Sequence, residues 1–426
     1  MIRQEFKELG IEVYTEELDN GLQVFLIPFN DRKNYYVEYL TRFGAEINEF
    51  KSRMTGKRVK VPYGVAHFLE HKMFEQEDGI NPFSFYSKSG VDANASTGYK
   101  ETTYTLEGVD NIEENIDFLL NYVNSPYFTD ENVEKEKGII IEELNMYKDQ
   151  PENKLYDKNN KSLFKYHPFR RDIGGTPRSV KSITKENLYE CYETFYQPSN
   201  MIIAIAGNFD KDKVLNVIKS NKKVNSKKDN SKIITYKVKE PISVNSKENS
   251  LKINNLIIPK FALSIKSFND IENGRDRYKF IICVDILLYV LFGSSSEFRE
   301  EMLENNFYSL FYFSSVLSDN ILLIEFICES KVPDAFKEKI MNQLKYKNFT
   351  SNDVERIKKV KISLEVMDTD KPYRVLDMVT GHLLDYGEVI YDKMDIIRSI
   401  TLDDVMNVRK TINFDNYSFT VAYPKK

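Results

Sequence analysis

The spacing of apolar residues along the first half of the chain predicts an alternation of strands and helices. The runs "GLQVFLIPF" (21–29) and "NYYVEYLTRFG" (34–44) are short and rich in branched and aromatic residues, so they predict two strands joined by a polar turn. Residues 92–108 have the Thr and Tyr content of two further strands with a turn near Gly98. In residues 111–126 the apolar positions recur every three or four residues, which predicts a helix.

Three more helices are indicated by residues that start or cap them. "VPYG" contains two helix breakers and precedes a helix that holds "VAHFLEHKMFE" (65–75). Thr129 is placed to cap a helix over 130–151, and residues 183–209 read as a capped helix followed by an apolar strand. These elements predict an α+β fold in which a mostly antiparallel sheet packs with helices.

The second half of the chain repeats part of the first. The segments "FTDENVEKEKGIIIEELNMYKDQP" (128–151) and "FTSNDVERIKKVKISLEVMDTDKP" (349–372) are identical at nine of 24 positions without a gap. "ITKENL" near the end of the first half is echoed by "ITLDDV" (400–405) near the end of the second. A duplication of about 220 residues therefore predicts two tandem homologous α+β lobes.

A change of composition separates the two expected lobes. The stretch "KSNKKVNSKKDNSK" is rich in Lys, Asn and Ser, which is typical of a solvated linker. We therefore predict a catalytic lobe over 1–218, a linker over 219–235 and a degenerate, non-catalytic lobe over 236–426.

Composition excludes several classes of protein. Of 426 residues, 41% are hydrophobic and 13% aromatic, and the net charge is −5, which argues against disorder and against an electrostatic nucleic-acid binder. The N-terminus lacks the apolar core of a secretory signal, and the longest apolar stretch (281–292) is too short to span a bilayer. Three cysteines without metal-type spacing fit reduced thiols, so we expect a cytoplasmic protein. From the charge and the short apolar stretches we expect no nucleic-acid or membrane partner.

Two of the four histidines stand four residues apart in "VAHFLEHKMFE". On a helix His67 and His71 share a face, so both imidazoles can bind one ion, and Glu70 lies beside them. Two imidazoles, a third ligand and a position left for water describe catalytic zinc, with the nearby carboxylate as general base. Imidazoles also suit other divalent metals, so zinc itself is an inference.

The helix over 130–151 offers carboxylates for the third ligand. At about 100° per residue, its inward stripe is Val133, Ile140, Leu144 and Tyr147. Glu143 and Glu136 lie beside this stripe, whereas Glu142 points away from it. Carboxylates close to a buried stripe need a partner, and a metal is one. We therefore predict Glu143 as a metal ligand and Glu136 as its supporting neighbour.

The duplicate lacks these chemical groups. Glu136 aligns with Ile357 and Glu143 with Leu364, so the apolar frame persists without the carboxylates. The remaining histidines, His167 and His382, have no comparable neighbours, and a structural role is the simpler interpretation for both.

The His-x-x-Glu-His pattern is the inverted zinc signature of the inverzincins. Together with "VDANASTGYKETTY", "VEKEKGIIIEELNMYKDQPE" and "SNMIIAIAGNFD", it resembles the pitrilysin, insulinase and mitochondrial-processing-peptidase family, especially its bacterial two-lobed members. The resemblance implies one Zn²⁺ per chain, bound by His67, His71 and Glu143, with Glu70 as the base. It also implies that Asn94 and Ala95 belong to an edge strand on which a peptide substrate pairs.

The resemblance further implies that the chain is half of a clamshell. We expect a zinc-dependent endopeptidase that hydrolyses short or unfolded peptides, such as leader or processing peptides, inside a two-chain chamber. Its partner would be a second copy of the chain or a related non-catalytic subunit. The alternative is a non-catalytic scaffold or regulatory subunit of the same family, although such proteins normally lose the motif that this chain retains.

Overall fold

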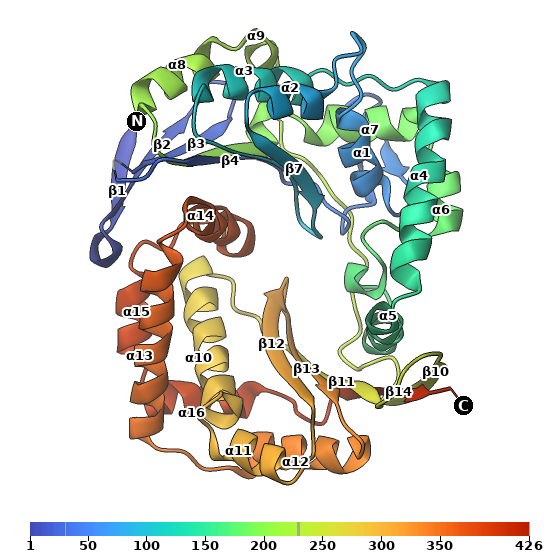
Figure 1. The fold of residues 1–426 in the computed structure, drawn as a ribbon, viewed down its shortest axis with the longest axis vertical. Coiled ribbons are helices and arrows are strands. Elements are labelled where there is room, and N and C mark those ends of the chain that lie inside the picture. The colour runs from blue at the N-terminus through green and yellow to red at the C-terminus, as the bar shows by residue number, and fades with distance from the viewer. Residues whose placement is uncertain (30, 228–230, 426) are drawn as a thin grey trace. The chain divides into compact units, whose positions relative to one another are not determined.

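The computed structural model describes residues 1–29, 31–227 and 231–425, which form two compact units (Figure 1). The first unit comprises residues 1–146, 172–237 and 368–384, and the second comprises 147–171, 238–367 and 385–426. Among the described residues no single helix is long and apolar enough to cross a bilayer; only the bent pair α10 (Gly274–Phe292) and α11 (Glu297–Glu304) passes that test, by length and composition alone.

The first unit is built on a mixed sheet in the order β1-β2-β3-β9-β4-β8-β7. Only β3 and β9 pair in parallel, because the long connection between them returns the chain to the centre of the sheet. The strands are β1 (Ile2–Phe6), β2 (Ile11–Glu17), β3 (Gln23–Pro28), β4 (Tyr35–Thr41), β7 (Asp92–Thr97), β8 (Thr102–Gly108) and β9 (Met201–Gly207), with a separate hairpin β5 (Glu49–Lys51) and β6 (Arg58–Lys60).

Helices and the sheet of the first unit share one apolar core. Tyr35, Val37 and Tyr39 point from β4 into this core, which α1, α3 and α7 complete. The helices are α1 (Val65–Met73), α2 (Pro82–Lys88), α3 (Ile112–Val123), α4 (Asp130–Lys148), α6 (Pro177–Lys181), α7 (Lys185–Phe195), α8 (Lys211–Ser220), α9 (Lys222–Asn225) and most of α14 (Pro372–Tyr386).

The second unit repeats this plan. Its sheet order, β10-β14-β11-β13-β12, matches β3-β9-β4-β8-β7 of the first unit, including a single parallel pair, β10 with β14. The strands are β10 (Glu248–Ile253), β11 (Lys260–Phe268), β12 (Leu310–Ser318), β13 (Ile321–Glu329) and β14 (Tyr417–Pro424). The helices are α5 (Pro151–Leu163), α10 (Gly274–Phe292), α11 (Glu297–Glu304), α12 (Pro333–Tyr346), α13 (Ser351–Asp368), α15 (Lys393–Ser399) and α16 (Leu402–Thr411). The expected pair of homologous α+β lobes is confirmed.

The two units exchange one helix. Helix α5 follows α4 in the first half of the sequence but packs on β10, β11 and β14 of the second unit. Helix α14 follows α13 in the second half but belongs to the first unit, where Figure 1 shows it on the side of the sheet opposite α3 and α8. The predicted lobes, 1–218 and 236–426, are each continuous in sequence, so they place α5 in the first lobe and α14 in the second and do not describe this exchange.

The exchanged helices contact corresponding strands, β11 and β4, from the same position of the repeat. Asn159 of α5 donates to Ser264 of β11 at 2.8 Å, and Thr380 of α14 donates to Glu38 of β4 at 2.9 Å. The two helix positions differ by 221 residues, the offset of the repeated segment. The exchange is therefore a symmetric property of the duplicated fold.

The expected linker is partly folded. It begins with the end of α8 and with α9, where Val224 is buried and Asn221 accepts hydrogen bonds from the backbone of α9. Residues 228–230 of the linker lie outside the described part of the chain.

Candidate metal centre

Helix α1 begins at a close backbone approach. Gly64 precedes it with φ of 89°, and a Cβ atom there would lie 2.3 Å from the carbonyl oxygen of Gly174. Only glycine tolerates this combination of positive φ and contact. The helix then buries Phe68 and Leu69 in the core, so that His67 and His71 share its less buried face.

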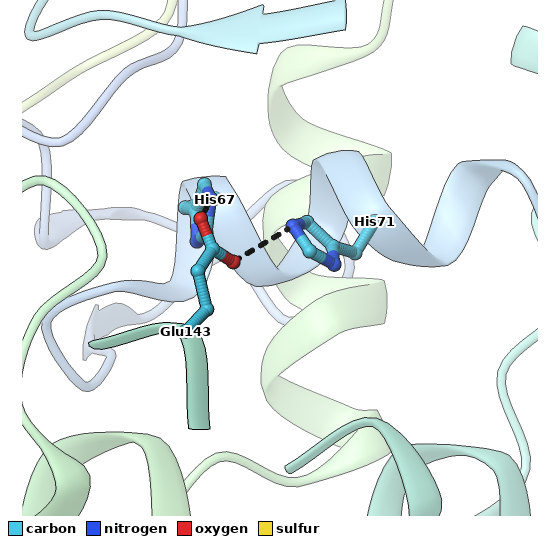
Figure 2. A group of neighbouring side chains, drawn as sticks. All are labelled: His67, His71 and Glu143. Carbon is cyan, nitrogen blue, oxygen red and sulfur yellow. Dashed lines mark ion pairs between the residues drawn. The ribbon is translucent and has the colours of Figure 1, made fainter. Parts of the chain in front are cut away.

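Helix α4 brings a carboxylate to the two histidines. Thr129 and Asn132 form a reciprocal capping interaction at its start, and Val133 and Ile140 fix its inward face. Glu143 then lies against both imidazoles, as Figure 2 shows: its oxygens are 3.8 Å from Nε2 of His67 and 3.6 Å from Nε2 of His71.

These three side chains fit a zinc ion. Their donor atoms lie within 4.8 Å of one another, and no other such group of three is found in the described residues. Tetrahedral zinc with ligand distances of about 2.0–2.2 Å places its donors roughly 3.4 Å apart, close to the separations seen here. Two nitrogens and one carboxylate oxygen leave a fourth position for water, as catalytic sites require.

Glu136 orients the imidazole of His71 through the Nδ1 atom. Its carboxylate lies 3.1 Å from Nδ1 of His71, so Nδ1–H donates to Glu136 and the lone pair of Nε2 faces Glu143. Burial acts to lower the pKa of His71, but the hydrogen bond and charge of Glu136, with the charges of Glu70 and Glu143, raise it overall. Burial acts to raise the pKa of Glu136, but the hydrogen bond and charge of His71, with the charges of Lys72 and Lys135, together lower it.

The environment of His67 differs from that of His71. Burial, with a smaller effect of His71, lowers its pKa to about 4. The imidazole is therefore neutral near pH 7, which is the form that binds a metal. Its Nδ1 atom is buried and has no hydrogen-bond partner in the described part of the chain.

Glu70 is the buried carboxylate of α1, with 8% of its surface exposed. Burial raises its pKa, while the hydrogen bond from Thr97 at 2.6 Å and the charge of His71 oppose the rise. A carboxylate whose pKa is raised is a stronger base than a free carboxylate, which suits the role of general base.

Strand β7 lies next to α1 and at the edge of its sheet. Asn94 and Ala95 are in the middle of this strand, and the amide oxygen of Asn94 accepts the Ala95 N–H at 2.9 Å. An edge strand presents backbone groups to which an extended peptide can add as a further strand.

Several further predictions can be compared with the structure. Glu142 is exposed, as the helical projection required. Tyr147 is 44% exposed and does not continue the inward stripe, because residues 145–150, which include the last turn of α4, are all exposed. His167 caps a short helical turn through Nδ1, and His382 is buried in α14, away from the metal centre. Thr97 was not found from the sequence, since no spacing links it to a carboxylate 27 residues earlier.

Two sequence profiles of one peptidase family match the chain. The profile of the insulinase family (peptidase family M16) matches residues 55–177, which contain the metal centre. A profile described as the peptidase M16 inactive domain matches residues 182–361, most of which belong to the second unit.

Relatives of similar length agree with these profiles. The chain is 34% identical to the "uncharacterized zinc protease YmfH" of Bacillus subtilis over 99% of both chains. It is 30% identical to the crystal structure of an M16-like peptidase from Alicyclobacillus acidocaldarius, with a TM-score of 0.92 over 97% of this chain and 99% of that one. The chain therefore belongs to the insulinase family, peptidase family M16.

A longer relative shares the fold. The periplasmic protease PqqL of Escherichia coli is 17% identical with a TM-score of 0.75, and the match covers 99% of this chain but 48% of PqqL. PqqL is thus about twice as long as this protein.

Proposed function

We propose that this protein is a zinc-dependent endopeptidase acting on short or unfolded peptides. The observation that carries the proposal is the convergence of His67, His71 and Glu143 on one point, with the buried carboxylate of Glu70 on the same helix. The names of relatives such as YmfH, a zinc protease, support the choice of metal, one ion per chain.

The residues of the site divide the chemistry between them. When bound by His67, His71 and Glu143, zinc would polarise the scissile carbonyl and lower the pKa of water to about 7. Glu70 accepts the proton of the attacking water and passes it to the nitrogen of the leaving amine. Glu136 holds His71 in the tautomer that offers Nε2 to the metal.

Strand β7 supports a preference for extended substrates. A peptide that pairs with Asn94 and Ala95 must expose its backbone, so a stably folded protein cannot bind in this way. Leader or processing peptides are unfolded and fit this requirement.

We further propose that the active form contains a second chain, either another copy or a related non-catalytic subunit. PqqL, which is about twice as long, and a relative named the beta subunit of a mitochondrial-processing peptidase support this proposal. The three buried, unpaired cysteines (Cys191, Cys283 and Cys328) fit a cytoplasmic location.

A role as a non-catalytic subunit is not favoured. The profile described as an inactive domain matches residues 182–361, whereas the metal centre lies within 55–177. The chain that carries the inactive second copy therefore also carries the complete set of ligands in its first copy.

The substitution Glu70→Gln tests the proposal. It leaves all three ligands in place but removes the proton acceptor, so peptide hydrolysis should fall by roughly 10²–10⁴-fold while zinc is retained. The measurement is the rate of cleavage of an unstructured peptide by the purified wild type and variant, with metal content determined in parallel. Near-normal turnover in the variant would show that Glu70 is not the base.

A further inference from the structure

Thr97 is the last residue of β7 and contacts Glu70 directly. Its hydroxyl donates to Oε2 of Glu70 at 2.6 Å. Alternation along β7 sets this direction, because Ala93, Ala95 and Thr97 share the half-buried face, and the two alanines pack on the core. Thr97 therefore faces α1 from the strand on which we propose that the substrate pairs.

The neighbouring hydroxyl fixes where the proton of Thr97 points. Thr102, fully buried, lies 3.5 Å from Thr97, but its own hydroxyl donates to the carbonyl oxygen of Phe43 at 2.9 Å. The proton of Thr102 is thus engaged elsewhere, and the proton of Thr97 is directed to Glu70. Oε2 of Glu70 is consequently an acceptor, and Oε1 is the oxygen available to receive another proton.

We propose that Thr97 is a positioning residue for the general base. It holds the carboxylate of Glu70 through Oε2, so that Oε1 takes the proton from water and returns it to the amine. Because Thr97 also terminates the substrate-binding edge strand, the base is oriented relative to the peptide that pairs there. This inference rests on the proposed peptidase function and assigns to Thr97 an effect on turnover rather than on binding.

Thr97→Val tests the role, because valine keeps the branched shape suited to a strand and removes only the hydroxyl. The value of kcat should fall about 10–100-fold, since a misdirected base loses much of its effect, while KM changes less than about threefold. Zinc content should equal that of the wild type. Thr97→Ser, which restores the hydroxyl, should recover most of the lost kcat.

Thr103→Val is the matched control. Thr103 lies on the neighbouring strand β8, where it pairs with Ser96 of β7, and it is half-buried like Thr97. The same substitution at Thr103 should therefore leave kcat near the wild-type value. Unchanged kcat in Thr97→Val, a rise in KM alone, or failure of Thr97→Ser to restore turnover would overturn the role of Thr97. Failure of the proposed function is distinguishable, because the wild type itself would then cleave no peptide and Glu70→Gln would change nothing.

Discussion

The metal centre of the first unit has a counterpart in the second, built on the corresponding elements. Helices α1 and α4 and strand β7 correspond to α10, α13 and β12, and the sheets behind them have the same order. Where the first unit gathers two imidazoles and carboxylates, the second has an ion pair: Lys361 of α13 lies 2.8 Å from Asp285 of α10. Ser315 of β12 donates to the same carboxylate at 2.8 Å.

The helix register explains why the second copy lacks the candidate ligands of the first. In α13, Ile357 and Leu364 replace Glu136 and Glu143, and Lys361 lies between them on the same helix face. Its ammonium group provides the positive charge that Asp285 requires. The strands and buried apolar residues therefore determine the fold in both copies, whereas a few polar substitutions decide whether a metal can bind.

Both exchanged helices lie beside a buried carboxyl group, but the group is on a different strand in each copy: Glu38 on β4 and Glu325 on β13. Glu38 in the first unit is 5% exposed, and burial raises its pKa to about 8, opposed by the hydrogen bond from Thr380 and assisted by Asp377 and Glu101. In the second unit α5 contacts Ser264 of β11, which donates to the carboxyl group of Glu325 on the neighbouring strand β13, and burial raises the pKa of Glu325 as well. Each unit should therefore lose stability as the pH rises, and Glu38 accounts for this dependence in the first unit.

Glu38→Gln should have the largest effect on stability. From about pH 4.5 to 8 the folded chain keeps Glu38 protonated while the unfolded chain ionises it. The unfolding free energy of the wild type therefore falls by up to about 4 kcal/mol as the pH rises through this range. Gln does not ionise, so the variant should lack this dependence. Denaturant unfolding of the wild type and Glu38→Gln at pH 5 and pH 8 measures this dependence. An equal pH dependence in wild type and Glu38→Gln would contradict the assignment.

A pair of substitutions at one aligned position separates metal chemistry from packing. Glu136→Ala removes the hydrogen bond to His71 and should weaken zinc binding by about 10–100-fold, with little loss of stability. Ile357→Ala, at the equivalent and buried position of α13, should leave zinc binding unchanged and cost about 2–4 kcal/mol in unfolding free energy. Competition with a chelator and denaturant unfolding measure the two quantities. If Glu136→Ala and Ile357→Ala changed zinc affinity and unfolding free energy in the same way, the proposed difference between the two positions would be wrong.

The smallest expected effect is at Lys361. Lys361→Met breaks a half-buried ion pair and should lower the unfolding free energy by about 1 kcal/mol without changing zinc content. Asp285→Asn combined with Lys361→Met should cost less than the two single substitutions added together, because both remove the same interaction. Additive losses would show that Lys361 and Asp285 do not stabilise each other.

The main elements and the shared helix face of His67 and His71 could be predicted from the sequence, because both depend on local periodicity. The predicted strands at 21–29 and 34–44 appear as β3 and β4, and the predicted helix at 111–126 appears as α3. His67 and His71 share a helix face by spacing alone.

Other features depend on contacts between distant residues and could not be derived from spacing. The hydrogen bond from Thr97 to Glu70 is one example. The exchange of α5 and α14 is another, since an amphipathic pattern shows that a helix has an apolar face but not which sheet covers it. The N-terminal hairpin of β1 and β2 was also missed, because the exposed strand β1 has little apolar pattern.

Zinc analysis of two adjacent variants tests the central claim, that the first copy binds a metal through Glu143. Glu143 contacts both imidazoles, whereas Glu142 is exposed and lies on another face of α4. Glu143→Ala should lose bound zinc and activity together, because two histidines alone form an incomplete site. Glu142→Ala should retain zinc and change stability by about 0.5 kcal/mol or less. Zinc kept by Glu143→Ala but lost from Glu142→Ala would contradict the account.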